Sequence, residues 1–443
     1  MRSVTTKQIA YTKGEKRVFL FLLMDYFSAF ASGGSSGSDD GESMIFLLSV
    51  ILMLSFAYIL THFVVTKLQK RFLFISGFEY ILLGLGLSLT ALYSDHQKIL
   101  PVLILSVGYF GLVQGIHGGI QKVFTGLEGG FRLAIIESIF TLIFISTIGA
   151  KAIEIIIPNL QPNENWYVGV MLGCSAIGGS TSVSELLQDK FPHIKSSIYT
   201  IIFQSTKISN IIAILTFGSL VCISFSFHSS EAMRTPSVMG WVTLGLGLGL
   251  GLLFSMFLDK TSDENSDFLA VTGITCLTAG AAAFLHVAVI TVTFFLGITL
   301  SYTRKASDLT TALVRSRRPM RLLLLVISGT LFVPIDIIRG SLFCIGYVFL
   351  RWIAKAIGGY IATIGTNMRI DIFRALLAQG EISLCIAVSG QMLFHSPATN
   401  MVFAAILLSV AVSEFFGPRI LKGLLIDNGD LNSTLNTTQS EIQ

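Results

Sequence analysis

Thirteen apolar segments follow one another along this chain, and each approaches the length needed to cross a lipid bilayer as a helix. They span residues 44–66, 72–93, 99–117, 131–150, 166–187, 196–226, 237–258, 267–285, 287–303, 320–338, 341–364, 371–394 and 400–425. A transmembrane helix needs about 20 mostly apolar residues. Only 13% of the residues are charged, against about 25% in a typical soluble domain. The sequence therefore predicts an all-α polytopic membrane protein with about 13 transmembrane helices.

The loops between these segments differ sharply in positive charge. If the loop at 67–71 lies in the cytoplasm, eighteen lysines and arginines fall in cytoplasmic loops. Only four fall in outer loops, namely Lys98, Lys151, Arg234 and Arg339. Because cytoplasmic loops carry the excess of basic residues, we expect the amino end of 44–66 outside and the carboxyl tail inside. The predicted location is the plasma or inner cell membrane.

The two ends of the chain differ in composition from its apolar middle. Residues 1–31 join a basic stretch to a short apolar run ending in Ala-Phe-Ala, which is typical of a cleaved signal peptide. A short extra helix is the alternative. Residues 32–43 are rich in glycine and serine and predict a flexible linker before a transmembrane domain at 44–425. Residues 426–443 are polar and predict a disordered cytoplasmic tail.

The segment 196–226 combines the length of a membrane span with a charged, polar middle. Lys207 and Asn210 are three residues apart and share one face of a helix, with Ser209 beside them. A charge at mid-membrane depth costs roughly 2.5–3.5 kcal/mol, so such residues are usually functional or paired. No aspartate or glutamate lies in this segment.

Two other segments are interrupted by glycine and polar residues. Segment 166–187 contains Gly178-Gly-Ser-Thr-Ser182, and segment 371–394 contains Gln379-Gly-Glu381. Unwound backbone is tolerated at membrane depth only where it lines a cavity or is buried in protein. A packing kink would explain either interruption alone. Two of them, in different halves of the chain, are typical of a transporter built from inverted repeats.

Alternating leucine and glycine at 244–252 predicts a helix that packs closely on another. Gly245 and Gly249 form one small-residue ridge, and Gly247 and Gly251 form a second. The partner is either this chain or a second copy, so a homodimer is left open. The lysine of a phosphate-binding loop is missing here. We find no Cys-x-x-Cys pair, metal-ligand cluster or nucleophile–base pair, and therefore expect no cofactor, metal, nucleic-acid partner or enzymatic activity.

The order and spacing of these motifs resemble the cation:proton antiporter superfamily, the bacterial sodium/proton and potassium-efflux antiporters. Ser180-Thr-Ser-Val183 lies where that family breaks its first crossing helix, and Gln379-Gly-Glu381 resembles the turn in the second. Lys355 matches the lysine of the members that move net charge. The resemblance implies two helix bundles, of which 99–226 and 320–425 would hold the site and the remainder would form a scaffold.

The sequence differs from the family pattern in segment 196–226, at the positions of the family's acidic pair. Where the family has Asp-Asp or Asn-Asp, this chain has Ser209-Asn210, and an amide offers an oxygen to a cation but cannot carry a charge. We therefore expect either weaker exchange or coupling through another acid, with Glu381 the first choice. Other acids that could neutralise the charges of Lys207 and Lys355 are Glu137, Glu79, Asp336 and Glu185. The predicted ion site consists of Gly179, Thr181, Ser182, Lys207, Ser209, Asn210, Lys355 and Glu381.

The sequence and the resemblance together predict a secondary transporter, a monovalent cation (sodium or potassium):proton antiporter. Its partners would be membrane lipid, a small monovalent cation and the proton. One rival is an exchange-deficient homologue that serves as a membrane sensor or scaffold. Another is a transporter of a different, anionic solute attracted by Lys207 and Lys355.

Overall fold

Every element that the structure describes is helical, as expected where each backbone polar group in lipid must be satisfied within its own segment. The computed structural model describes residues 77–88, 96–119, 128–158, 160, 162–191, 197–228, 235–258, 264–333, 337–366, 368–394 and 396–429. The predicted segment 44–66, and the expectations for residues 1–43 and 430–443, lie outside these ranges. All described residues belong to one unit, residues 60–443.

The helices follow the apolar segments closely. They are α4 (Phe78–Ser88), α5 (His96–His117), α7 (Glu128–Ile156), α8 (Pro162–Ile177), α9 (Thr181–Lys190), α10 (Ser197–His228), α11 (Pro236–Leu258), α12 (Glu264–Phe284), α13 (Val289–Ser301), α14 (Ala306–Thr330), α15 (Ile337–Thr363), a 3-10 turn η3 (Ile370–Ile372), α16 (Phe373–Leu376), α17 (Glu381–Leu393) and α18 (Pro397–Asp427). Eleven of the twelve segments predicted between 72 and 425 coincide with one helix or one broken helix. The exception is 320–338, because α14 begins at Ala306 and ends at Thr330, so the arginines at 315–321 lie in a helix and not in a loop.

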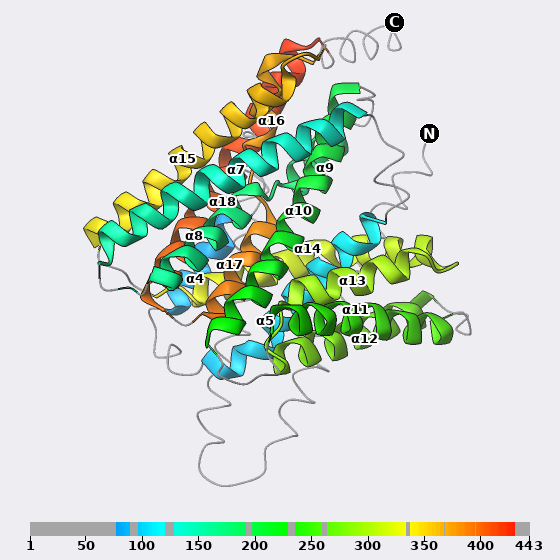
Figure 1. The fold of residues 1–443 in the computed structure, drawn as a ribbon. Coiled ribbons are helices and arrows are strands. Elements are labelled where there is room, and N and C mark those ends of the chain that lie inside the picture. The colour runs from blue at the N-terminus through cyan, green and yellow to red at the C-terminus, as the bar shows by residue number, and fades with distance from the viewer. Residues whose placement is uncertain are drawn as a thin grey trace, which may run out of the picture. The chain divides into compact units, whose positions relative to one another are not determined.

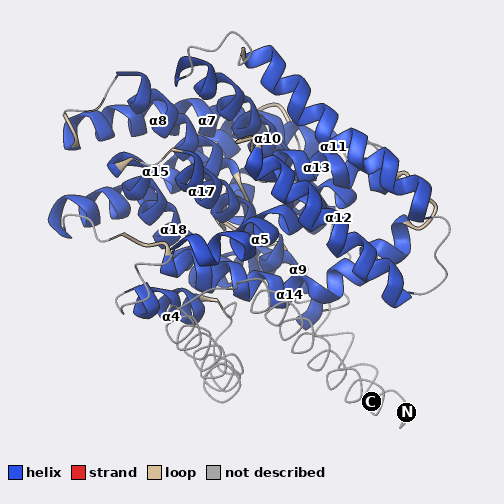
Figure 2. Ribbon diagram, turned by 90° about the horizontal axis from the view of Figure 1, so that it is seen from below, coloured by secondary structure: helices blue, strands red, loops and turns tan. Residues whose placement is uncertain are grey.

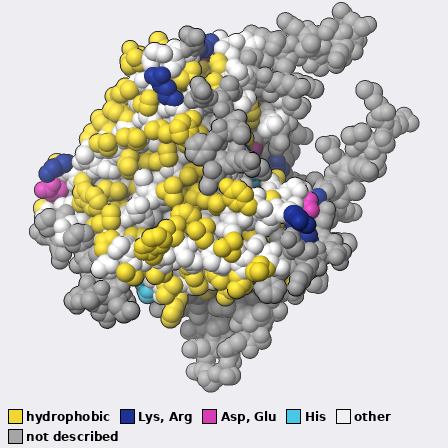
Figure 3. Space-filling view, turned by 45° about the vertical axis from the view of Figure 1, so that its right-hand side comes forward, with side chains coloured by type: hydrophobic (Ala, Val, Ile, Leu, Met, Phe, Trp, Pro, Cys, Tyr) yellow, Lys and Arg dark blue, Asp and Glu magenta, His cyan; other side chains and the backbone are white. Residues whose placement is uncertain are grey.

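The lengths and surface of these helices suit a membrane. In the described ranges, seven helices are long and apolar enough to span one, and eight if the bent pair at 370–393 counts as a span. Hydrophobic side chains cover most of the face in Figure 3, and the few charged ones lie near its margins. The predicted division near His286 is also present, because that residue turns the chain between α12 and α13 with φ 56°. The predicted fold class is confirmed.

The helices pack as two groups (Figures 1 and 2). In the scaffold group, which comprises α4, α5 and α11–α14, α13 packs mainly on α5 and α11, and α14 packs on α4 and α5. In the crossing group, which comprises α7–α10 and α15–α18, α7 packs on α8, α10 and α15, and α18 packs on α15 and α17. The expectation that 99–117 and 320–338 belong with the site is therefore wrong, because α5 and α14 belong to the scaffold.

Glycines explain why α5 and α13 pair so closely. A Cβ atom added to Gly115 would lie 2.2 Å from the carbonyl oxygen of Phe294, and one added to Gly297 would lie 2.3 Å from that of Leu112. Any larger residue would force the two backbones apart. This close contact with α13 places α5 in the scaffold group.

Candidate functional site

Two broken helices cross in the middle of the crossing group. The first break separates α8 from α9 at 178–180, and the second separates α16 from α17 at 377–380. The second pair is bent by 54°. The two extended segments touch, because Ser180 N donates a hydrogen bond to Ala378 O at 3.1 Å. A Cβ on Gly380 would lie 2.6 Å from Ser180 Cα, so only glycine fits at this contact. The predicted pair of broken crossing helices is confirmed.

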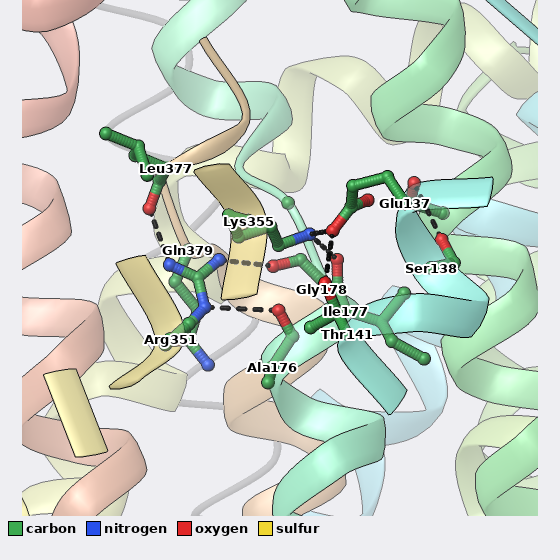
Figure 4. A network of polar contacts seen from close by, with 12 residues as sticks. Glu137, Ser138, Thr141, Ala176, Ile177, Gly178, Arg351, Lys355, Leu377 and Gln379 are labelled. Atoms are coloured by element: carbon green, nitrogen blue, oxygen red, sulfur yellow. Dashed lines mark hydrogen bonds and ion pairs between the residues drawn. The ribbon is translucent and has the colours of Figure 1, made fainter. Parts of the chain in front are cut away.

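Two cations from α15 bind the carbonyl groups exposed by these breaks (Figure 4). The buried guanidinium of Arg351 donates from Nε to Ala176 O at 3.1 Å, from Nη2 to Gly178 O at 3.2 Å and from Nη1 to Leu377 O at 2.5 Å. Lys355 Nζ donates to Ile177 O at 2.8 Å. The carboxyl end of a helix carries partial negative charge, so both cations are favourably placed.

Lys355 also forms an ion pair with Glu137 from α7 (Figure 4). Its Nζ lies 2.7 Å from Glu137 Oε1, and the two side chains are only 1% and 0% exposed. Thr141 Oγ1 donates to the same oxygen at 2.8 Å. Glu137 Oε2 is buried and has no hydrogen-bond partner among the described residues. At the crossing, therefore, one oxygen of the buried Glu137 carboxylate is bound by Lys355 and Thr141, and the other has no partner among the described residues.

The pair Ser209-Asn210 contacts both the break and α7. Gly179 N donates to Asn210 Oδ1 at 2.9 Å, within the first break. Ser138 Oγ donates to Ser209 Oγ at 3.1 Å, and Ser138 directly follows Glu137 in the chain. The amide at 210 is therefore an acceptor for the unwound backbone, and α7 and α10 meet beside Glu137.

Lys207 lies on α10 with its side chain half-buried. Its ammonium lies 4.2 Å from the centroid of the Phe203 ring, one turn earlier on the helix. Its main-chain oxygen accepts a hydrogen bond from Gln114 Nε2 on α5 at 3.1 Å. Lys207 therefore contributes a cation–π contact and a backbone link to the scaffold group.

Glu381 lies in a second polar cluster, at the amino ends of α9 and α17. Ser182 Oγ donates to Glu381 Oε1, and Arg321 Nε of α14 lies 3.3 Å from the same oxygen. Arg317 Nη2 lies 3.9 Å from it and also donates to Thr181 Oγ1. We call the set of Arg317, Arg321, Glu185, Glu381 and Glu414 the arginine cluster.

The structure therefore places seven of the eight predicted residues at two locations and the eighth, Lys207, apart from both. Gly179, Ser209, Asn210 and Lys355 lie at the crossing, whereas Thr181, Ser182 and Glu381 contact the arginine cluster, and Lys207 lies apart on α10. Sequence reasoning missed Arg351, although an arginine inside an apolar segment is the same signal that identified Lys355. Asp336 lies outside the described residues.

Comparison with known proteins identifies the family. Residues 128–426, about two-thirds of the chain, match the family model for the transmembrane sodium/hydrogen exchanger. The chain belongs to the sodium/hydrogen exchanger family. The resemblance to cation:proton antiporters is confirmed, and this exchanger is a secondary transporter of the monovalent cation:proton antiporter type.

A solved structure shares the fold of this exchanger. It is that of the sodium proton antiporter MjNhaP1 from Methanocaldococcus jannaschii at pH 8, with a TM-score of 0.60 and 15% sequence identity. The match covers 88% of this exchanger and 99% of that chain. A search among curated proteins found no match.

Proposed function

We propose that this exchanger binds a small monovalent cation, sodium or potassium, in competition with a proton at the carboxylate of Glu137. One observation carries the proposal. Glu137 is a fully buried acid at the crossing of the broken helices, with one oxygen bound by Lys355 and the other without a partner in the described residues. A proton and a hard cation both bind carboxylate oxygen, so occupation by one excludes the other.

The neighbours of Glu137 suit this competition. When the carboxylate carries neither ion, the Lys355 ammonium neutralises it at 2.7 Å. Ser138 and Ser209 join α7 to α10, and Asn210 binds the first break. We propose that their hydroxyl and amide oxygens supply the neutral ligands that hard cations take. In this proposal Asn210 contributes an oxygen and Glu137 carries the charge that changes.

Glu381, the acid favoured from the sequence, is less suited to this role. Two arginines lie within 4 Å of its carboxylate, at 3.3 and 3.9 Å. Arginine stays protonated at every accessible pH, so its charge always competes with an incoming cation. The ion-pair partner of Glu137 in the described residues is a lysine, which is able to release its proton.

The rival functions find less support in the geometry. An anion would need a free cation at the crossing, but Lys355 already binds Glu137 and the Ile177 carbonyl. The sensor or scaffold function predicts a folded protein without exchange, and a transport measurement separates it from ours. We also propose that transport is the only activity of this exchanger and that it acts without a cofactor.

The deciding experiment is cation-driven proton movement in proteoliposomes. We expect the parent to exchange, Glu137→Gln to fall to the level of protein-free liposomes, and Glu381→Gln to retain exchange. Glu154→Gln is the matched control, because Glu154 lies on the same helix but is 54% exposed and pairs with Lys151. Exchange that survives Glu137→Gln contradicts the proposed site. A folded parent that exchanges no cation contradicts the proposed function and favours the sensor or scaffold.

We propose further that the exchanger lies in the cell membrane with the amino end of 44–66 outside and the tail in the cytoplasm. The excess of basic residues between alternate segments supports this orientation, even without the four arginines at 315–321, which the structure places inside α14. The domain boundaries at 31, 43 and 425 belong to the same proposal.

A homodimer is supported by α11. A Cβ on Gly247 would lie 2.5 Å from Val292 O of α13, so this glycine ridge packs within the chain. Gly245 and Gly249 have open space instead. We propose that a helix from a second copy packs against this ridge of Gly245 and Gly249.

A further inference from the structure

Helix α10 contacts the crossing on one side and the scaffold group on another. Its pair Ser209-Asn210 contacts α7 and the first break. Its main chain accepts two hydrogen bonds from scaffold side chains. Gln114 Nε2 of α5 donates to Lys207 O at 3.1 Å, and Thr291 Oγ1 of α13 donates to Ile214 O at 3.2 Å. The helix that carries the predicted ion-site residues is therefore bonded to the scaffold through its backbone.

The two acceptor carbonyls lie on one face of α10. Lys207 and Ile214 are seven residues apart, which is close to two full turns and about 10 Å along the helix axis. A carbonyl oxygen has two lone pairs, so each can accept the scaffold donor as well as the hydrogen bond of its own helix. The scaffold therefore holds α10 at two points of the same face.

The two donors belong to a tightly packed helix pair. Gln114 directly precedes Gly115, one of the glycines at the close contact between α5 and α13. Near the other donor, a Cβ added to Gly111 of α5 would lie 2.5 Å from Ile290 O, and Ile290 directly precedes Thr291. Neither helix can shift without breaking this packing, so the spacing between the donors is fixed.

Gly218 makes the position of α10 specific. Carbonyl groups recur at every turn of a helix, so hydrogen bonds alone would also fit α10 after a shift of one turn. A Cβ added to Gly218 would lie 2.6 Å from Thr291 Cγ2, so Thr291 occupies a place where α10 has no side chain. A shift of one turn would bring Ile214 or Cys222 to that place, and either side chain would collide with Thr291. The contact of Thr291 with Gly218 therefore fits one position of α10.

We propose that Thr291 and Gly218 are positioning residues for exchange, which fix α10, and with it Ser209-Asn210, relative to the scaffold. Alternating access in secondary transporters is largely movement of one helix bundle against the other around the site. A contact that is made in only one of two states raises the population of that state. The Thr291–Gly218 contact thereby sets the ratio between the described state and the alternative one, and it breaks whenever the groups move past each other.

The test is the distribution of distances between two spin labels in the full-length exchanger in lipid nanodiscs, at one pH and one salt concentration. One label takes the place of Ile155 on α7 of the crossing group, and the other that of Leu277 on α12 of the scaffold group. These side chains are 81% and 59% exposed. Labels attached to an unnatural amino acid leave the five native cysteines unmodified. The relative amounts of the distances report the ratio of states.

Two variants should shift this ratio in the same direction. Thr291→Val keeps the volume of the side chain but removes the donor, and the net contribution of one hydrogen bond corresponds to about a fivefold change in an equilibrium constant. We therefore expect about a fivefold change in the ratio, away from the described state. Gly218→Ala should act likewise, because its methyl group collides with Thr291 in that state. Thr291→Ser keeps the hydroxyl group and should retain the parent distribution.

Thr293→Val is the matched control, since Thr293 is buried on the same helix but donates to carbonyl groups of that helix. Its distribution should equal that of the parent. An unchanged distribution in Thr291→Val, a shift opposite to that of Gly218→Ala, or an equal shift in Thr293→Val overturns the proposal. If Thr291→Val does not fold, Gly218→Ala carries the same comparison. The measurement uses no transport, so failure of the Glu137 proposal leaves it intact.

Discussion

Replacement of Lys355 by methionine tests how much the buried Lys355–Glu137 ion pair contributes to the free energy of unfolding. Methionine keeps most of the side-chain volume but leaves the Glu137 carboxylate without its cation in a site where both groups are fully buried. Removing one partner of a buried pair typically destabilises a protein by about 3–5 kcal/mol, because the remaining charge is uncompensated.

A double-mutant cycle separates the charge effect from the packing effect. Glu137→Gln in the Lys355→Met background removes the unpaired negative charge of Glu137. The double variant should therefore recover about 2 kcal/mol or more of the stability that Lys355→Met loses. The measurement is unfolding of the purified protein in detergent, followed by circular dichroism.

The control for this cycle is the pair Lys151–Glu154, which has a similar separation of 2.9 Å but side chains that are 78% and 54% exposed. An exposed pair contributes about 0–1 kcal/mol, so Lys151→Met should be nearly neutral. If Lys355→Met costs no more than Lys151→Met, then burial of an ionised Lys355–Glu137 pair is refuted.

Three further predictions follow from the site, the loops and α11. Asn210→Asp should fold and create or strengthen pH-dependent cation exchange in vesicles, because Gly179 N–H can donate to a carboxylate as it does to the amide. A folded variant with unchanged exchange would exclude position 210 from the site. A reporter active only in the cytoplasm and fused after residue 443 should be active, and activity of an outside-only reporter would reverse the topology. Gly249→Leu should dissociate the dimer in native mass spectrometry without loss of folding, and an intact dimer would exclude this ridge.

The breaks were predictable from sequence because their physical cause is local. Glycine and polar groups at 178–182 and 379–381 interrupt apolar segments, and lipid does not tolerate unwound backbone unless protein covers it. The need for an acid near Lys355 was predictable for the same reason, since a buried lysine requires a counter-charge.

The identity of that acid was not predictable, because it depends on how α7 packs against α15. A Cβ on Gly358 would lie 3.3 Å from Glu137 Cα, and this close approach brings the carboxylate to Lys355. Several glutamates fulfil the electrostatic requirement equally well in the sequence, and only the packing distinguishes them. The same limit explains why α5 and α14 were assigned to the wrong group.

The three hydrogen bonds of Arg351 have a mechanical consequence. They connect α15 to carbonyl groups on both sides of the crossing, Ala176 and Gly178 in the first broken helix and Leu377 in the second. Neither break can unwind further or separate from the other without exposing a buried guanidinium. We therefore expect α8, α15 and α16 to move as one rigid body during transport. Spin-label distances within this body should stay constant, while distances from it to α13 change.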